Sequence, residues 1–260
     1  MLIDAHIHLD RYEEELDAAL QQMVENRIFS IGVSMDIPSY ERTLEIGGRC
    51  ELVLPAFGVH PWNASEYADR LGDVRWAVEQ TPLFGEIGLD YHFVEDTSRY
   101  PAQRKVFEFF LAAAREQNKV VNLHTKGAEQ DVLQLLEKHD VQRVIVHWYS
   151  GPVEVFRRLA ARGVHFTFGP ELLESEHIQA LARECPLQHL LTETDNAGQR
   201  LPDGSVRMPL LVRDVVTALA GVREMTVEAM METVEANLLR LIGDDPWLSQ
   251  VRAGLFERSQ

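Results

Sequence analysis

Short apolar runs alternate with amphipathic stretches along the whole chain of 260 residues. Several runs are almost continuous in Val, Ile and Leu, which is typical of parallel strands buried on both faces. The segments between them carry apolar residues at helical spacing. The alternation predicts eight strands, at Leu2–His8, Ile28–Met35, Leu52–His60, Leu83–Asp90, Val120–Thr125, Arg143–Tyr149, His165–Pro170 and His189–Asp195.

Three of the intervening segments have clear helix signals at their ends. Pro101 stands in the first turn of one predicted helix, where proline is well tolerated. Pro152 opens a second helix, and Gly163 follows it as the expected C-cap. Thr226 is the expected N-cap of a last helix, and Gly243 lies beyond its end. These signals support the helical reading of the amphipathic segments.

This order of elements predicts an α/β fold, a (β/α)8 TIM barrel formed by residues 1–260 as a single domain. Barrels of this kind commonly take about 250 residues. A doubly wound open sheet is the competing architecture, and it would need a glycine-rich phosphate loop. The sequence contains neither G-x-G-x-x-G nor G-x-x-x-x-G-K-[ST]. We therefore expect the barrel.

The net charge of −16 argues against an extended surface for duplex nucleic acid, because such a surface needs clustered Lys and Arg. It leaves room for a small site that takes one strand end or one phosphate. The two cysteines, Cys50 and Cys185, show no pairing pattern, and neither a signal peptide nor an apolar run of about 18 residues is recognisable. We expect a cytoplasmic protein without membrane association.

The first predicted strand carries three polar residues on one side. Successive side chains of a strand alternate between its faces, so Asp4, His6 and His8 point the same way. Two imidazoles that converge from one strand form half of a site for Zn²⁺ or a similar ion. The strand therefore predicts a metal site, although paired histidines also occur in structural roles.

Histidine or acidic residues stand at the ends of six predicted strands. Glu86 is framed by glycines inside an apolar run, where a buried carboxylate needs a cation or a salt bridge. The carboxyl ends of all strands border one pocket in a barrel, so these residues are expected to meet there. Besides His6 and His8 they are His60, Glu86, Asp90, His124, His147, Glu193 and Asp195.

The other histidines fall at helix ends, at strand starts or within helices. We expect them to be structural or to lie on the surface; they are His139, His165, His177 and His189. His92 lies just past the strand of Glu86, near the predicted pocket, and is not expected to be a ligand.

Taken in order, these motifs make the chain similar to the TatD family of metal-dependent hydrolases within the amidohydrolase superfamily. The resemblance covers nearly the whole sequence, and the E-I-G-L-D element is the most specific part of it. The shared motifs are D-A-H-I-H-L-D at 4–10, G-V-H-P at 58–61, G-E-I-G-L-D at 85–90, His124, H-W-Y-S-G at 147–151, E-T-D at 193–195 and Asn237.

The resemblance implies a site for two divalent metal ions, which could be Zn, Mn, Mg, Ni or Fe. It implies that Glu86 bridges the two ions and takes part in catalysis. The implied ligands are His6, His8 and Asp195 for one ion and His124 and His147 for the other. Family members are described as deoxyribonucleases, some of them exonucleases on single strands.

The positions of further residues near these ions suggest roles in hydrolysis. Asp195 would orient the attacking water and take its proton. His60 and Lys126 would stabilise charge that develops on the substrate. Trp62 and Tyr91 follow two of the strands closely, so each is expected either to stack on a base or sugar or to pack beneath a loop.

The sequence departs from the family pattern at three places that bear on the substrate. Lys126 stands where the family usually has Arg, which keeps the charge and loses the bidentate fork. Trp148 and Tyr149 replace a Cys-Phe pair, and residues 196–198 replace a small residue and Pro. In the loop that follows, Arg200 and Arg207 are either phosphate contacts or part of a solvated surface.

Three functions remain open at this point. The first is a phosphodiesterase or deoxyribonuclease that acts on DNA ends or single strands. The second is a hydrolase of a small lactone, amide or phosphate ester that uses the same metal site. The third is a non-catalytic binding or scaffold protein, which the complete set of predicted ligands disfavours. The family motifs favour the first, whereas the net charge of −16 and Lys126 favour the second.

Overall fold

The computed structural model describes residues 1–197, 206–243, 245–246 and 248–249. Within this part of the chain, each strand is followed by at least one helix. The strands are β1 (Leu2–Ile7), β2 (Ile28–Gly32), β3 (Val53–Pro55), β4 (Phe84–Gly88), β5 (Val121–His124), β6 (Val144–Val146), β7 (His165–Phe168) and β8 (Leu190–Thr192). Each lies inside one predicted range, so the predicted order of strands is confirmed.

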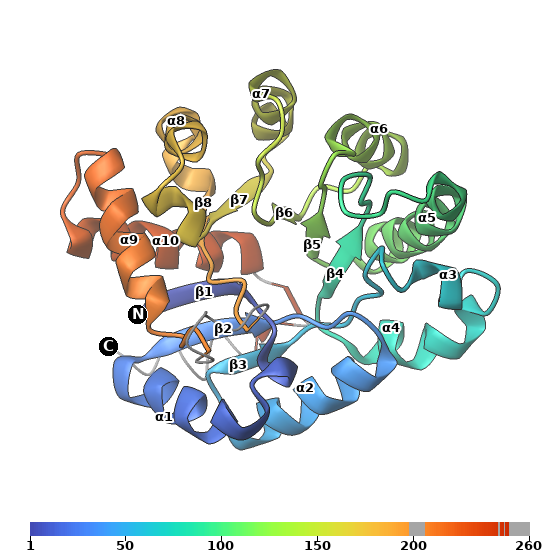
Figure 1. Ribbon diagram of the computed structural model, residues 1–260, viewed down its shortest axis with the longest axis horizontal. Coiled ribbons are helices and arrows are strands. Elements are labelled where there is room, and N and C mark those ends of the chain that lie inside the picture. The colour runs from blue at the N-terminus through green and yellow to red at the C-terminus, as the bar shows by residue number, and fades with distance from the viewer. Residues whose placement is uncertain (198–205, 244, 247, 250–260) are drawn as a thin grey trace.

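The helices lie outside the strands (Figure 1). In chain order they are α1 (Leu16–Asn26), α2 (Ile37–Arg49), α3 (Ala64–Tyr67), α4 (Arg75–Gln80), α5 (Tyr100–Gln117), α6 (Glu129–His139), α7 (Val153–Ala161), α8 (Glu176–Glu184), α9 (Leu211–Val222) and α10 (Val227–Ile242). The predicted cap at Thr226 is confirmed, because its side chain accepts a hydrogen bond from the backbone of Ala229. Gly163 is not itself the C-cap of α7: it follows the cap Arg162, with φ +84°.

All strand pairs are parallel, and they form two arcs, β1-β2-β3 and β4-β5-β6-β7-β8. Backbone hydrogen bonds join the arcs at both junctions. Gly85 N donates to Phe57 O at 2.9 Å, and Asp195 N donates to His6 O at 3.0 Å. Regular ladders do not cross the junctions within the described residues. The α/β fold with a TIM-barrel-like arrangement is as predicted, with two arcs in place of one continuous ladder.

Several strands bury polar side chains together with apolar ones. Every residue of β1, β4 and β5 is buried. Most of these side chains are apolar and join the core, but His6, Glu86 and His124 are also buried. A buried charge or imidazole is costly unless it has a partner. The barrel therefore holds its polar strand residues where they face one another.

The predicted strands extended too far at their carboxyl ends. The third was predicted to reach His60, whereas β3 ends at Pro55. The eighth was predicted to reach Asp195, whereas β8 ends at Thr192 and Asp195 has φ +51°. At His60 the chain has left the ladder, because His60 N donates to Met35 O at 2.9 Å instead of to a neighbouring strand. The segments that carry His60 and Asp195 are thus loops that follow strands, whereas His6, Glu86 and His124 lie within strands.

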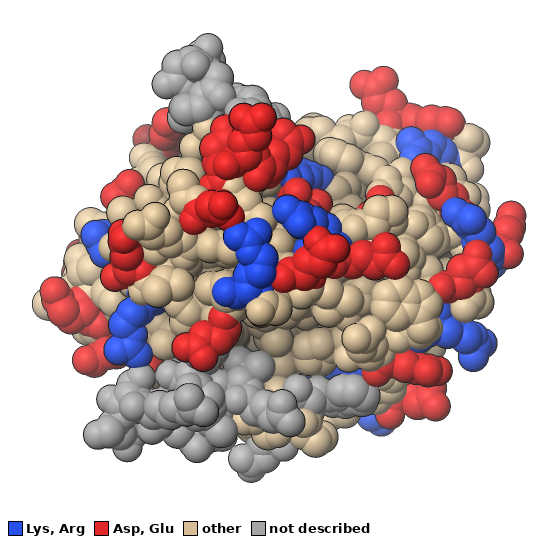
Figure 2. All heavy atoms as spheres, turned by 90° about the horizontal axis from the view of Figure 1, so that it is seen from below, with Lys and Arg blue, Asp and Glu red and all other residues tan. Residues whose placement is uncertain are grey.

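Acidic and basic side chains are interspersed on the face shown in Figure 2, and its described residues form no continuous basic track. This agrees with the net charge of −16. No helix in the described part of the chain is long and apolar enough to cross a membrane. Cys50 and Cys185 are buried and free, as the absence of a pairing pattern predicts.

Two histidines outside the predicted site lie together in the barrel wall. His165 begins β7, and its ring centroid lies 5.2 Å from that of His189, which precedes β8. Within the described residues, neither ring nitrogen of His165 has a hydrogen-bond partner. Burial, with smaller contributions from His189 and Arg240, lowers the pKa of His165 from 6.5 to about 4. His165 is therefore neutral in the folded protein, consistent with a structural role.

We expect this residue to weaken the fold in acid. Between pH 6.5 and 4 the unfolded chain protonates His165 and the folded protein does not, so stability falls as the pH drops through this interval. From pH 7 to pH 5 the loss should be about 2 kcal/mol. Urea unfolding of His165→Leu should show a correspondingly smaller loss, whereas the exposed control His177→Gln should follow the parent. An equal loss in His165→Leu would contradict this assignment.

Candidate metal centre

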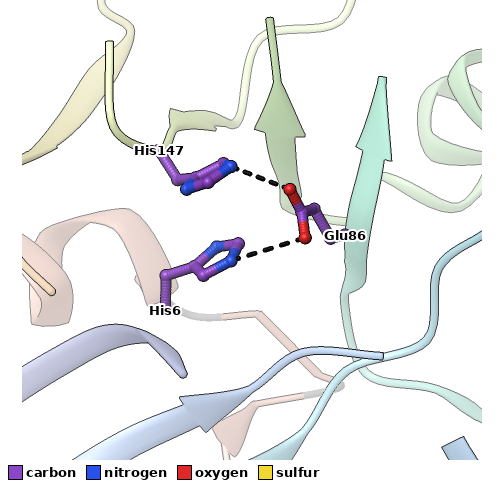
Figure 3. A group of neighbouring side chains, drawn as sticks. All are labelled: His6, Glu86 and His147. Carbon is purple, nitrogen blue, oxygen red and sulfur yellow. Dashed lines mark ion pairs between the residues drawn. The ribbon is translucent and has the colours of Figure 1, made fainter. Parts of the chain in front are cut away.

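Glu86 of β4 lies at the centre of a cluster of imidazoles, and its side chain is only 3% exposed. One oxygen, Oε1, lies 2.8 Å from His124 Nδ1, 2.8 Å from His147 Nε2 and 3.3 Å from His60 Nε2. His124 Nδ1 and His147 Nε2 are themselves 3.3 Å apart. This oxygen therefore faces ligand atoms from β5 and from the segment after β6. Figure 3 shows Glu86 between His6 and His147.

The second oxygen of Glu86 faces the first strand. Oε2 lies 3.3 Å from His8 Nε2 and 3.6 Å from His6 Nε2. The Asp195 carboxylate lies on the same side, 3.6 Å from both of these nitrogens. The alternation of side chains along β1 thus brings His6 and His8 to one carboxylate pair, as the D-A-H-I-H pattern predicts.

Three sets of side chains are suited to holding a cation. Within each set, one ligand atom per residue lies within 4.8 Å of the others. All of them offer imidazole nitrogen or carboxylate oxygen, the donors that Zn²⁺ and related ions prefer. The sets are His6, His8 and Asp195; His6, Glu86 and His147; and His60, Glu86 and His124.

Two imidazoles have hydrogen-bond partners on the side of the ring that points away from Glu86, and these partners fix which ring nitrogen faces Glu86. Asn122 Nδ2 donates to Ala5 O at 2.8 Å, so its Oδ1 accepts from His6 Nδ1 at 3.0 Å. His124 Nε2 lies 2.9 Å from Asp90 Oδ2, which leaves Nδ1 turned toward Glu86. Such partners orient metal-binding histidines and raise their basicity.

Glu193 lies beside His147 without a hydrogen bond to its ring, since His147 Nδ1 has no hydrogen-bond partner among the described residues. Its Oε2 accepts from Thr167 Oγ1 at 2.6 Å and lies 3.6 Å from His147 Nδ1. Its Oε1 accepts from the backbone of Trp148 at 3.0 Å. His147 Nε2, the other ring nitrogen, faces Glu86.

The charges of the site favour a cation. His6 Nε2 has no hydrogen-bond partner among the described residues and faces two carboxylates. Burial lowers the pKa of His6, but the carboxylate of Glu86, with Asp195, outweighs this and raises it to about 10. Burial likewise opposes ionisation of Glu86, yet the surrounding imidazoles hold its pKa well below the ordinary range. A metal ion would supply this positive charge, so the residues present fit one.

Two further residues set the position of Asp195. The buried Asp4 accepts from Thr194 N at 2.9 Å and from Thr194 Oγ1 at 2.6 Å, which ties β1 to the segment after β8. Burial raises the pKa of Asp4 to about 7 against the effect of these hydrogen bonds. Asp195 itself keeps 22% of its side chain exposed. Of the carboxylates near His6, it is therefore the more accessible one.

His60 is a neutral hydrogen-bond donor toward the centre. Its Nδ1 accepts from Trp62 N at 3.2 Å, which places the ring proton on Nε2. Burial lowers the pKa of His60 to about 4, against the attraction of Glu86. The ring lies edge to face with Trp62, whose Nε1 donates to Asp90 Oδ2 at 2.7 Å. Both residues therefore border the centre.

Lys126 and Tyr91 are engaged elsewhere. Lys126 Nζ donates to Trp148 O and Ser150 Oγ, both at 2.8 Å, and lies 4.0 Å from the centroid of the Trp148 ring. The Tyr91 hydroxyl donates to Asp131 of α6 at 3.2 Å, and its ring stacks on Tyr100 of α5. Of the two roles open for Tyr91, packing is the one that these contacts support.

The loop after Asp195 is only partly described. Arg200 lies outside the described residues. The backbone carbonyl of Arg207 accepts a hydrogen bond from the Tyr12 hydroxyl at 2.9 Å. This contact holds the backbone at Arg207 beside Tyr12, in the segment between β1 and α1.

Sequence reasoning placed Asp90 and Glu193 at the pocket without assigning a role to them or to Asn122. Asp90 and Asn122 hydrogen-bond to an imidazole, and Glu193 lies 3.6 Å from one. Spacing gave a signal for all three. Asn122 stands two residues before His124, Glu193 two residues before Asp195 and Asp90 four residues after Glu86, so alternation puts each pair on one side of a predicted strand. The imidazole that each of the three contacts comes from another segment, so these contacts could not be predicted from spacing.

Comparison with known proteins decides the family. Residues 3–243 match the family described as TatD related DNase. The chain belongs to the TatD family. It is similar to the uncharacterized metal-dependent hydrolase YabD of Bacillus subtilis, with 28% identity over 93% of this chain and 98% of that protein. It is also similar to deoxyribonuclease TATDN3 of Homo sapiens, with 26% identity over 92% and 94% of the two chains.

A solved structure supports the fold of this TatD-family chain. The TatD homologue YJJV from Escherichia coli superimposes with a TM-score of 0.83 and 23% identity, over 92% of this chain and 97% of that one. The predicted family and the TIM-barrel fold are thus confirmed. The chain is a metal-dependent hydrolase of the TatD family.

Proposed function

We propose that this TatD-family protein is a phosphodiesterase that removes nucleotides from DNA ends or single strands with the help of two divalent cations. The observation that carries the proposal is the position of Glu86, whose two oxygens face separate groups of imidazoles. We assign His6, His8 and Asp195 to one ion, His124 and His147 to the other, and Glu86 to both. The relative named deoxyribonuclease TATDN3 supports the choice of substrate.

When bound, the ions would acidify a water molecule and neutralise charge on a phosphoryl oxygen. Asp195 accepts the proton of the attacking water and returns a proton to the leaving oxygen. Its partial exposure lets it reach the substrate, whereas Glu86 is enclosed. His60 donates from Nε2 to a phosphoryl oxygen, and its low pKa keeps it neutral in this role.

One observation favours a second candidate, hydrolysis of a small phosphate ester or lactone at the same centre. The ammonium of Lys126 is already held by Trp148 O and Ser150 Oγ. Burial lowers the pKa of Lys126 as well, although nearby carboxylates oppose this. A small substrate would depend less on this cation than a nucleic acid strand would.

The proposal is tested with single-stranded DNA that carries a label at one end. With Mg²⁺ or Mn²⁺ the purified protein should shorten the DNA stepwise, and a chelator should stop the reaction until metal is restored. A p-nitrophenyl phosphate ester and a lactone are assayed in parallel. Turnover of these alone, with intact DNA under every metal, would replace the first proposal with the second.

A further inference from the structure

Two large aromatic side chains are exposed next to the candidate metal centre. Trp62 is 41% exposed and Phe93 is 54% exposed. Their rings meet edge to face, with centroids 6.1 Å apart and planes at 81°. We call this pair the aromatic corner. Two exposed rings at nearly right angles offer a planar ligand apolar contact from two sides.

A single carboxylate joins the aromatic corner to the metal centre. Asp90 is fully buried, and its Oδ2 accepts from Trp62 Nε1 at 2.7 Å and lies 2.9 Å from His124 Nε2. Its Oδ1 accepts from the backbone of His92 and Phe93 at 2.9 and 2.7 Å. The same side chain therefore fixes the indole, the loop that carries Phe93 and His124, one of the two imidazoles nearest to Glu86.

A second contact joins the corner to His60, and a cation lies beside it. Trp62 N donates to His60 Nδ1, and the two rings are 4.8 Å apart. The guanidinium of Arg99 donates to the carbonyl oxygen of Trp62. A ligand in the corner would thus lie beside the group that we assign to the phosphoryl oxygen, with a positive charge nearby.

We propose that the aromatic corner binds one nucleobase of the substrate and that Asp90 is a positioning residue, which holds the corner and His124 in fixed relation. The inference deepens the proposed function by naming what the site recognises next to the scissile bond. Stacking on an aromatic ring tolerates any base, because every base has a π-face. The expected specificity is for a planar base, with little preference among the four.

Binding of mononucleotides tests the corner without turnover. By calorimetry the protein should bind deoxyadenosine 5′-monophosphate about tenfold more tightly than deoxyribose 5-phosphate, which lacks the base. Trp62→Leu should remove most of this difference, and Trp62→Phe, which keeps a ring, should retain much of it. Trp76→Leu is the matched control, because Trp76 is 42% exposed and lies on α4. An unchanged preference in Trp62→Leu would overturn the inference.

The positioning role of Asp90 has its own readout. In Asp90→Asn, the amide nitrogen that replaces Oδ2 cannot accept from Trp62 or His124. Both the base preference and the bound metal should fall, the metal affinity by about 10- to 100-fold. Asp96→Asn is the control, since the carboxylate of Asp96 accepts hydrogen bonds from Ser98 of its own loop and from no other described residue. Loss of one property without the other would refute the shared role.

The activity assay separates this inference from the proposed function. Two single strands are compared, one complete and one with an abasic terminal residue. If the DNA stays intact but mononucleotide binding shows a base preference, the proposed function is refuted and the aromatic corner is supported. If both DNA strands are shortened equally fast and mononucleotide binding shows no base preference, the proposed function is supported. The inference about the aromatic corner is then refuted.

Discussion

Glu86→Gln should abolish hydrolysis and most of the metal binding at once. The substitution keeps the size of the side chain but removes the negative charge that faces five imidazoles. Loss of a residue that only orients a ligand already weakens metal binding by about 10- to 100-fold. We therefore expect metal affinity to fall by more than about a hundredfold and kcat/KM by more than about a thousandfold.

Elemental analysis of the purified variant and a hydrolysis assay measure the two effects together. Glu45→Gln serves as the control, because Glu45 lies on α2 with a side chain that is 65% exposed. Circular dichroism shows whether the variant folds, and Glu86→Asp, which restores the charge on a shorter side chain, should recover part of the metal. A Glu86→Gln protein with full metal content and activity would refute the central role of this carboxylate.

Strand periodicity was sufficient to predict much of this centre. Three residues of the D-A-H-I-H segment lie on one face by alternation alone, and two of them, His6 and His8, do approach Glu86. The eight buried apolar runs fix the order of strands, and this order brings their carboxyl ends to one pocket. Both inferences depend only on the spacing of polar and apolar residues, which the sequence contains directly.

Other features depend on contacts that local spacing does not encode. The connection from Trp62 through Asp90 to His124 joins three strand ends, so no single segment reveals it. Phe93 was missed for the same reason. Lys126 is bound by the carbonyl of Trp148, a residue with φ +39°, and that backbone turn is not apparent from the sequence. Long-range hydrogen bonds of this kind required the structure.

The neighbourhood of Tyr91 shows where closeness in sequence misleads. Tyr91 directly follows Asp90, whose carboxylate contacts His124 on the side away from Glu86, yet the ring and hydroxyl of Tyr91 contact α5 and α6. Side chains of consecutive residues diverge where a strand passes into a loop. Adjacent positions therefore belong to different environments, one beside the metal centre and the other in the helical layer.

Asp195→Asn should separate metal binding from proton transfer. The amide can still face His6 and His8, whose nitrogens lie 3.6 Å from Asp195 Oδ1, but it cannot accept a proton from water. General acid–base catalysis is commonly worth about 10²- to 10⁴-fold. We expect kcat to fall by about that factor, with a much smaller change in KM and a metal content closer to the parent than that of Glu86→Gln.

Steady-state kinetics and elemental analysis of the same preparation test this, with Asp73→Asn as the control, because the side chain of Asp73 is 64% exposed. The contrast between the two site variants is decisive. If Glu86 holds the ions and Asp195 also accepts the proton, Glu86→Gln should lose the bound metal and Asp195→Asn should keep it. Turnover should fall in both variants. Equal loss of metal in both variants would make Asp195 a ligand alone, and unchanged kcat in Asp195→Asn would assign the proton to another group.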